Sequence, residues 1–291
     1  MNTWLLRVVW VLLPVTAGEE LSTALHSWSD APRLTASVML WGLWALVLGA
    51  VMMPRPVAMT IVRVGAPLAC MVTVIAAFSS APSTVSVVVA IVMTLAACVL
   101  GLRGEFPRVC AQGAAYGDEE RFPLKVPPGI TWIVLPNAIF LIGAGIATGP
   151  LLIANETWVV GIVLTVLGWP LAAFVTRLVH QLSRRWLVLV PAGLVVADPL
   201  TLTDPVLFVR EKIQGIGPAD PTRRAPAEAL DLRLGAAFGS CAVLLDEEAP
   251  LLRRVRGRAE GVQAGLLLVT PADAHLLLER AAARHLPVHQ H

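Results

Sequence analysis

Charged side chains are scarce in this sequence. Only 14% of its 291 residues are Asp, Glu, Lys or Arg, whereas soluble globular domains carry about 25%. The formal net charge of +2 at pH 7 is too small to indicate an electrostatic surface for nucleic acid. These absences argue against a chain that is water-soluble throughout, and nucleic acid is not an expected partner.

A cysteine framework is also missing. Cys70 and Cys98 fall inside apolar runs, Cys110 in a charged loop and Cys241 near the C-terminal end. No CxxC pair or Cys/His cluster has the spacing of metal ligands. We therefore interpret the four cysteines as small apolar fillers or free thiols, and we expect neither a metal site nor a cofactor.

Hydrophobic residues, by contrast, make up 56% of the chain. A membrane-spanning helix needs about 20 mostly apolar residues, and the first 183 residues contain five clear runs of this kind and a shorter N-terminal one. We predict a membrane α-helical bundle with about six spans, at residues 4–25, 34–53, 57–78, 85–102, 130–153 and 158–179.

The N-terminal run has two interpretations. WLLRVVWVLLPVTA, residues 4–17, has the length of a signal-peptide core, and its last three residues resemble a cleavage site. However, Arg7 lies inside the apolar run and not ahead of it. We favour an uncleaved first helix, and cleavage of residues 1–17 stays open.

The distribution of Lys and Arg predicts the orientation, since cytoplasmic loops collect these residues. With six crossings, the basic connections share one side, while the opposite side receives mainly acids and a single arginine, Arg33. We therefore expect a multi-pass protein of the bacterial inner (plasma) membrane with both termini in the cytoplasm. The basic residues are Arg55, Arg103, Arg108, Arg121, Lys125, Arg177, Arg184 and Arg185, and the acids are Glu19, Glu20, Asp30 and Glu156.

Polar residues inside the predicted spans are few. Arg63 lies about 9 Å from its span end at 1.5 Å per residue, so we expect its stem to reach the headgroups. Asn137 is expected to serve helix packing more than substrate binding, and Thr60 is the third polar candidate. Gly143 and Ala147 are expected to form a small-residue face that lets another helix approach closely.

After residue 183 the pattern changes to short β-type runs, separated by Pro, Gly and Asp, and one final helix. Thr270 is expected to cap this helix, with Pro271 at its first position and Pro287 beyond its end. Several short strands followed by one helix predict a small α+β domain.

Two segments of this domain carry a resemblance. RRWLVLVPAGLVVADPLTLTDPVLFVREKIQGIG and TPADAHLLLERAAARHLPV resemble the bacterial PH-like domains found on membrane proteins of actinobacterial, high-GC Gram-positive type. The resemblance covers about residues 184–288 and implies a strongly bent antiparallel sheet, nearly a barrel, plugged by one C-terminal helix. It implies a scaffold or regulatory module in the cytoplasm and transfers no catalytic residue.

Within this domain, RRVRGR is a concentrated basic patch of four arginines, Arg253, Arg254, Arg256 and Arg258. They are predicted either to face anionic lipids of the cytoplasmic leaflet, at about 1 kcal/mol per cation, or to pair with the nearby acids at 246–248. The second interpretation is favoured because these acids are so close. The tail at 289–291, with its histidines, is expected to be a frayed terminus and not a metal site.

The cytoplasmic loop at 104–129 is too long for a simple connector. Three consecutive acids in a wet loop are expected to titrate normally, so they do not suit an acid/base pair, and we assign no catalytic residue. We expect instead that the loop docks on the C-terminal domain, with Asp118, Glu119 and Glu120 against Arg253–Arg258 and Phe122 as anchor.

The expected role is non-catalytic: a scaffold, interaction or regulatory component at the cytoplasmic membrane. Its partners would be the lipid bilayer, anionic lipids and unidentified proteins. The alternative is a transporter or permease-like component, which requires a polar cavity lined by Asn137, Thr60 and Arg63. Whether the chain is an enzyme stays open, although the sequence favours the negative answer.

Overall fold

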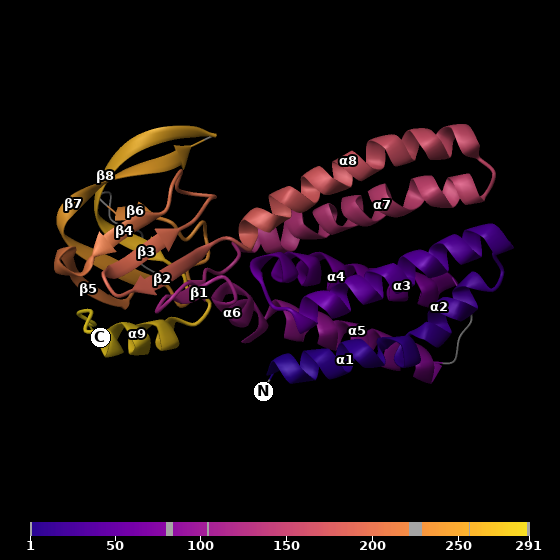
Figure 1. Ribbon diagram of the computed structural model, residues 1–291, viewed down its shortest axis with the longest axis horizontal. Helices are drawn as coiled ribbons and strands as arrows, with labels where there is room; N and C mark the ends of the chain where they lie inside the picture. The colour runs from indigo at the N-terminus through magenta and orange to yellow at the C-terminus, as the bar shows by residue number, and fades with distance from the viewer. Residues whose placement is uncertain (1, 80–83, 104, 221–228, 256, 290–291) are drawn as a thin grey trace. The chain divides into compact units, whose positions relative to one another are not determined.

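The computed structural model describes residues 2–79, 84–103, 105–220, 229–255 and 257–289 (Figure 1). It divides into two compact units. The helical unit comprises Met1–Cys110 and Leu135–His180, and the β unit comprises Ala111–Val134 and Gln181–His291. Most of the segment between the fourth and fifth long apolar helices, from Ala111 on, therefore belongs to the β unit, and the chain passes between the units three times.

The helical unit contains six helical stretches that are long and apolar enough to cross a membrane, which confirms this part of the prediction. The first is broken at Ala17 into two helices. The helices of the whole unit are α1 (Asn2–Thr16), α2 (Gly18–Leu25), α3 (Asp30–Met52), α4 (Pro56–Ser79), α5 (Thr84–Leu102), the short α6 (Glu105–Gln112), α7 (Leu135–Ala154) and α8 (Trp158–Leu182).

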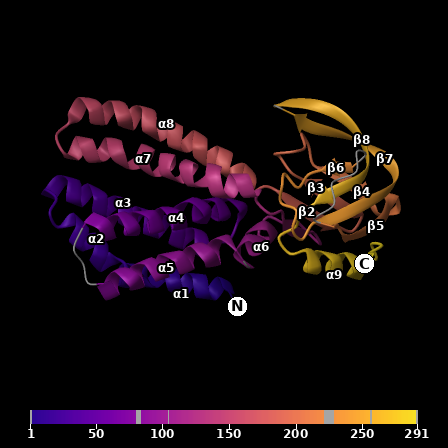
Figure 2. The ribbon, with the colours of Figure 1, turned by 180° about the vertical axis from the view of Figure 1, so that it is seen from behind.

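One apolar cluster joins α1, α3, α4 and α5, and Figure 2 shows these helices from behind. Trp10 of α1 and Trp44 of α3 lie close together in this part of the unit. Each indole Nε1 donates a hydrogen bond of 2.9 Å to the backbone carbonyl oxygen of the other tryptophan. These reciprocal bonds satisfy both donors inside an apolar region, where an unpaired N–H would be costly.

Helices α7 and α8 pack closely through small residues. A Cβ atom added to Gly168 would overlap the Gly145 carbonyl oxygen, and one added to Gly149 would meet the backbone of Thr165. Gly143 instead faces Leu68 of α4. Another helix, α4, therefore comes close at Gly143, as predicted, whereas the contact with α8 uses Gly145 and Gly149.

The β unit consists of two four-stranded sheets and a final helix, which confirms the coarse α+β prediction. One sheet has the order β1-β2-β3-β4 and the other β5-β7-β8-β6. The strands are β1 (Glu120–Pro123), β2 (Trp186–Val190), β3 (Gly193–Ala197), β4 (Val206–Val209), β5 (Ile213–Pro218), β6 (Ala229–Asp231), β7 (Cys241–Val255) and β8 (Arg258–Val269); the helix is α9 (Ala274–Ala283), and two short helical turns are η1 (Ile130–Val134) and η2 (Arg210–Lys212).

The pairing departs from the expected antiparallel sheet at one place, because β6 pairs with β8 in parallel. Side chains from both sheets and from α9 enclose one apolar core. The helix cap also differs: the Asp273 carboxylate accepts a hydrogen bond of 3.0 Å from the Leu276 backbone N–H, whereas the Thr270 hydroxyl donates to the Ala236 carbonyl.

The C-terminal tail is ordered at least to residue 289. The Ile216 N–H donates to the Pro287 carbonyl at 2.8 Å, and the His289 N–H donates to the Ile216 carbonyl at 2.9 Å. The expectation of a frayed end from residue 289 is therefore wrong for His289, because the backbone of β5 offers it an unpaired edge. His291 lies outside the described residues.

Candidate functional site

The loop between the spans supplies an edge strand of the β unit. Glu120 to Pro123 form β1, which pairs antiparallel with β2 from Leu189 to Trp186. Phe122 is only 2% exposed and belongs to the core of the unit. The expected anchor thus lies inside the domain, as part of its sheet and not on its surface.

The acids of this loop have other partners than Arg253–Arg258. Glu120 lies 3.5 Å from Arg280 and 4.0 Å from Arg284, both in the α9 region, and the Asp118 carbonyl accepts a hydrogen bond from Arg284. Glu119 pairs with Arg121 at 3.0 Å. The prediction chose Arg253–Arg258 because they form the dense basic patch of the sequence. The fold instead brings Arg280 and Arg284, two arginines at the last helix, next to β1.

Local electrostatics follow from these contacts. The hydrogen bond from the Arg121 guanidinium lowers the pKa of the Glu119 carboxyl, so this acid stays ionised at neutral pH. The same guanidinium lies 4.9 Å from the ring centre of Trp186, a cation–π distance. Arg121 therefore connects the loop both to its own acid and to β2.

A buried ion pair fastens the other end of β1. The Arg185 guanidinium donates to both carboxylate oxygens of Asp198, at 2.8 and 2.7 Å, and the two side chains are 1% and 0% exposed. It also donates to the carbonyls of Lys125 (2.9 Å) and Leu232 (3.2 Å). All these partners belong to different segments, so one arginine joins the loop, the end of β3 and the segment after β6.

In the sequence, Arg185 was recognisable only as a basic flank of the last span. Its position directly before β2, and the aspartate at the end of β3 thirteen residues later, gave no periodic signal. A charged residue stands before the strand–turn–strand pattern and an acid stands after it, which is compatible with an ion pair across the two strands. Only the sheet register shows that both ends of the hairpin turn inward.

The polar candidates of the helical unit differ in their surroundings. Thr60 is buried, and its Oγ1 lies 2.7 Å from Nδ1 of His180 in α8. Arg63 is only 4% exposed, so the expectation that it reaches outward along its stem is wrong. Asn137 occupies an exposed position of α7.

Two cysteines outside the spans are buried thiols. Burial raises the pKa of Cys110, at the end of the helical unit, to about 12, against smaller lowering effects of Arg55 and Arg63. Burial raises the pKa of Cys241 in β7 to about 11. Both thiols are protonated at neutral pH and are poor nucleophiles there. Within the described parts of the chain, no three His, Cys, Asp or Glu residues could hold a metal ion.

The basic patch lies at the end of the β7–β8 hairpin, which we call the ribbon tip (residues 253–258). Arg253, Arg254 and Arg258 are exposed, and Arg256 lies outside the described residues. Ion pairs between the tip arginines and the acids at 246–248 were the favoured prediction. In the part of the tip that the structure describes, neither Arg254 nor Arg258 forms such a pair. Glu247 instead lies 3.8 Å from Lys212. These acids lie within the register shift between Leu244 and Ala249, and the paired residues 249–252 lie between them and the tip.

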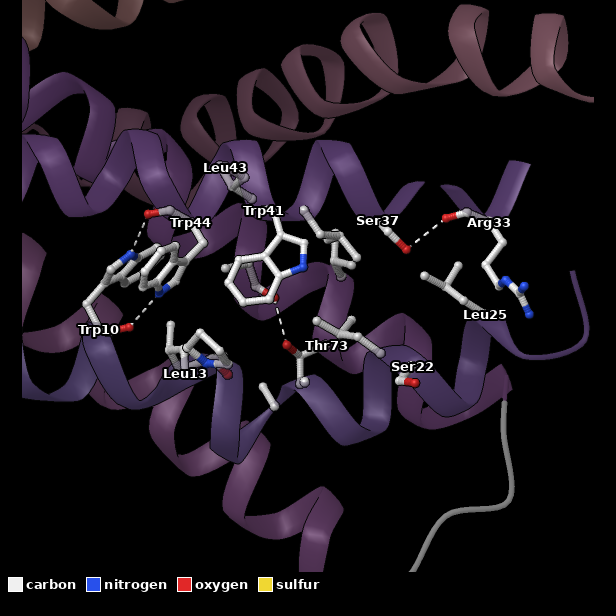
Figure 3. A pocket seen from close by; sticks show the side chains of 18 residues that line it. Trp10, Leu13, Ser22, Leu25, Arg33, Ser37, Trp41, Leu43, Trp44 and Thr73 are labelled. Atoms are coloured by element: carbon white, nitrogen blue, oxygen red, sulfur yellow. Dashed lines mark hydrogen bonds between the residues drawn. The ribbon is translucent and has the colours of Figure 1, made fainter. Parts of the chain in front are cut away.

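A cavity of about 380 Å³ lies among α1 to α5 of the helical unit (Figure 3). Trp10 and Trp44 stand at one end, with Leu13 and Leu43 beside them, and Arg33 at the other. None of Asn137, Thr60 or Arg63 lines it. Its size is in the usual range of ligand sites, about 300–1,000 Å³.

Two hydroxyls in the walls of the cavity are already bonded within their own helices. The hydroxyls of Thr73 and Thr94 each donate 2.9 Å hydrogen bonds to carbonyls of their own helices, Ala69 and Ala90. Trp41 extends the wall and meets Trp44 edge to face at 5.5 Å between ring centres. The sequence did not reveal this site, because tryptophans at span ends and mid-span have the same apolar pattern.

Comparison with known proteins adds no assignment: no protein-family model, no curated protein and no solved structure matches this chain. The function of the chain is therefore inferred from its own geometry.

Proposed function

We propose that this chain is a multi-pass integral membrane protein with a regulatory or scaffolding role, whose β unit works in the cytoplasm. The observation that carries the proposal is β1, which comes from between two long apolar helices and completes a sheet of the C-terminal unit. A domain attached as a simple appendage needs only one connection to its helices. This domain includes part of the helix-to-helix segment, so it cannot detach from the helices without losing an edge strand.

The membrane location is supported by six helices of sufficient length and apolarity. The cytoplasmic side is supported by the basic residues that collect at the connections. A bacterial inner membrane is the corresponding location. The tip arginines, exposed at the end of a long ribbon, support a contact with anionic lipids of the same leaflet.

We further propose that the β unit is a divergent PH-like domain. Two packed sheets with a C-terminal helix support this assignment. The parallel β6–β8 pair and the strand taken from the preceding loop are its departures from the expected pattern. An actinobacterial-type origin agrees with the Ala- and Arg-rich composition of this region.

The transporter alternative required a cavity at Asn137, Thr60 and Arg63. The cavity of the helical unit is lined by other residues, and Arg63 is buried within the bundle. We therefore place the scaffold or regulatory role first.

The location is tested with reporter fusions at the C-terminus. A fluorescent protein that folds only in the cytoplasm should be bright in the membrane fraction, and a phosphatase that acts only outside should be inactive. An active phosphatase would overturn the orientation, and extraction of the chain by alkaline carbonate would overturn the membrane location.

The role is tested by purification of the full chain from its own membranes in mild detergent. A scaffold should retain a protein partner in fixed proportion and lose it in Arg185→Ala, which disrupts the β unit. Tyr116→Ala is the matched control, because this loop side chain is 87% exposed. Recovery of the chain without any partner in fixed proportion would contradict the scaffold proposal.

A further inference from the structure

The cavity of the helical unit has the length of one membrane leaflet. It follows α3 from Arg33, near the helix start, to Trp44. Eleven residues at 1.5 Å per residue give about 17 Å, close to half of the ~30 Å hydrocarbon core of a bilayer. A cavity with this extent begins at the interface and ends near the bilayer centre.

The inner end is closed by the reciprocal Trp10–Trp44 hydrogen bonds, which leave no indole N–H of this pair free to bind a polar group. The Thr73 and Thr94 hydroxyls are likewise bound to their own helices. A polar or charged molecule would lose its hydration here and find few partners, because the lining is mainly apolar. The inner part of the cavity therefore suits a hydrocarbon chain.

The outer end has the opposite chemistry. Arg33 Nη2 lies 2.8 Å from Asp30 Oδ1, and the side chains are 44% and 95% exposed. Figure 3 shows the Arg33 guanidinium near Leu25, at the end of the cavity opposite Trp10 and Trp44. Exposed ion pairs contribute little to stability, so each partner can exchange the other for a ligand charge.

An arginine binds phosphate through two parallel N–H donors, and an aspartate accepts from an ammonium group. A headgroup with one phosphate and one ammonium therefore complements this pair better than a purely anionic headgroup would. An acyl chain attached to that headgroup would extend toward the tryptophans.

We propose that this cavity binds one acyl chain of a zwitterionic, ethanolamine-type phospholipid from the leaflet at the α2–α3 connection. Arg33 holds the phosphate, Asp30 faces the ammonium, and the Trp10–Trp44 pair contacts the end of the chain. This inference depends on the proposed membrane location, and it gives the helices a specific lipid to recognise.

The test uses the full chain in bilayers that contain a phosphatidylethanolamine with a photoreactive group at the end of one acyl chain. After irradiation, mass spectrometry should locate most of the label around Leu13, Leu43 and Trp44. Label spread evenly over exposed lipid-facing residues such as Val159 and Val166 would overturn the proposal. Failure of the chain to enter bilayers at all would overturn the membrane location itself, and is seen before irradiation.

A matched pair of glycine variants tests the cavity. Gly18 lines the cavity, Gly42 does not, and a Cβ at either has open space around it. Gly18→Leu should lower labelling of the three inner residues at least about fivefold, whereas Gly42→Leu should leave it unchanged. Equal labelling in both variants would contradict the cavity assignment.

Headgroup recognition is tested at exposed positions, where replacement does not threaten folding. Arg33→Gln should lower the labelling severalfold for every phospholipid. Asp30→Asn should lower it for the ethanolamine lipid and not for a phosphatidylglycerol probe. Labelling by a photoreactive fatty acid that is independent of Arg33, or a preference for phosphatidylglycerol, would overturn the headgroup assignment.

Discussion

The helical unit and the β unit differ in how far their large apolar side chains are exposed. In the helical unit, residues such as Phe78, Val159 and Val166 are exposed along the whole length of the helices. In the β unit, residues such as Phe122 and Leu187 are enclosed in one core between two sheets and a helix. Burial of apolar area drives folding in water, so the difference is the one expected if the first unit lies in the proposed membrane and the second in water.

The two units also differ in what holds their elements together. The helical unit depends on small residues, such as Gly145 and Gly168, that let helix backbones approach. Such close packing replaces the hydrophobic effect when the surroundings are themselves apolar. The β unit depends on a core and on a buried, fully bonded ion pair between Arg185 and Asp198.

The largest effect is expected where this ion pair is broken. Arg185→Ala leaves the Asp198 carboxylate buried without its partner, which costs about 3–5 kcal/mol of unfolding free energy. Pulse proteolysis of the full chain in urea and mild detergent should show early cleavage within the β unit, while the helical unit persists.

The double variant Arg185→Met with Asp198→Leu sharpens this test, because removal of both charges avoids the unpaired carboxylate and should restore much of the stability. If Arg185→Ala unfolds no earlier than the wild type, the pair does not hold the β unit together.

A somewhat smaller effect is expected in the loop strand. Phe122→Ala removes a buried ring from an edge strand, and about 3 kcal/mol is expected, at the lower end of such substitutions because an edge can partly collapse. The same proteolysis assay should report earlier cleavage in the C-terminal strands, far downstream in the sequence. Tyr116→Ala should change stability by less than about 0.5 kcal/mol. If the two variants were equally stable in this assay, the loop would not be part of the folded β unit.

In the helical unit, the contact between α7 and α8 can be overpacked by one methyl group. Gly168→Ala places a Cβ against the Gly145 carbonyl and should cost about 1–3 kcal/mol. Thermal unfolding in detergent, followed by tryptophan fluorescence, measures the change. Gly49→Ala, whose Cβ meets nothing within 4 Å, is the control and should be neutral or slightly stabilising. A neutral Gly168→Ala would show that these helices do not need the close approach.

The smallest expected effect concerns the alkylation rate of one buried thiol in each unit. With a pKa of about 12 for Cys110 and about 11 for Cys241, the thiolate fraction at pH 8.5 is below about 1% for both. Alkylation of the folded chain should therefore be slow at both cysteines, become faster as the pH rises, and be fast after denaturation. Rapid alkylation of either residue at pH 8.5 would show that it is not buried in solution.

Some features were predictable from local pattern. Helix length and apolarity predicted the six long helices, because a span of this kind is a continuous run along the chain. Likewise, the short β-type runs at 187–190, 194–197 and 206–209, separated by Pro and Gly, predicted β2, β3 and β4 to within one residue. These signals depend only on neighbours in sequence.

Other features were not predictable, because they join distant segments. The four residues of β1 show no strand pattern, and they pair only because β2 offers an edge of matching register. Arg63 was expected near the headgroups, yet the bundle buries it. The cavity is lined by residues from five helices, so no single apolar segment of the sequence predicts it.

By itself, the sequence determined how many long apolar helices the chain forms and that a mixed α/β segment follows them, because both depend on local hydrophobicity and turn residues. Only the tertiary structure decided that the loop belongs to the β unit, that Arg185 and Asp198 meet, and that Trp10 and Trp44 close a cavity. Hydrogen bonds and ion pairs between segments distant in the sequence are satisfied by the packing of the whole chain, and the order of residues along it does not specify them locally.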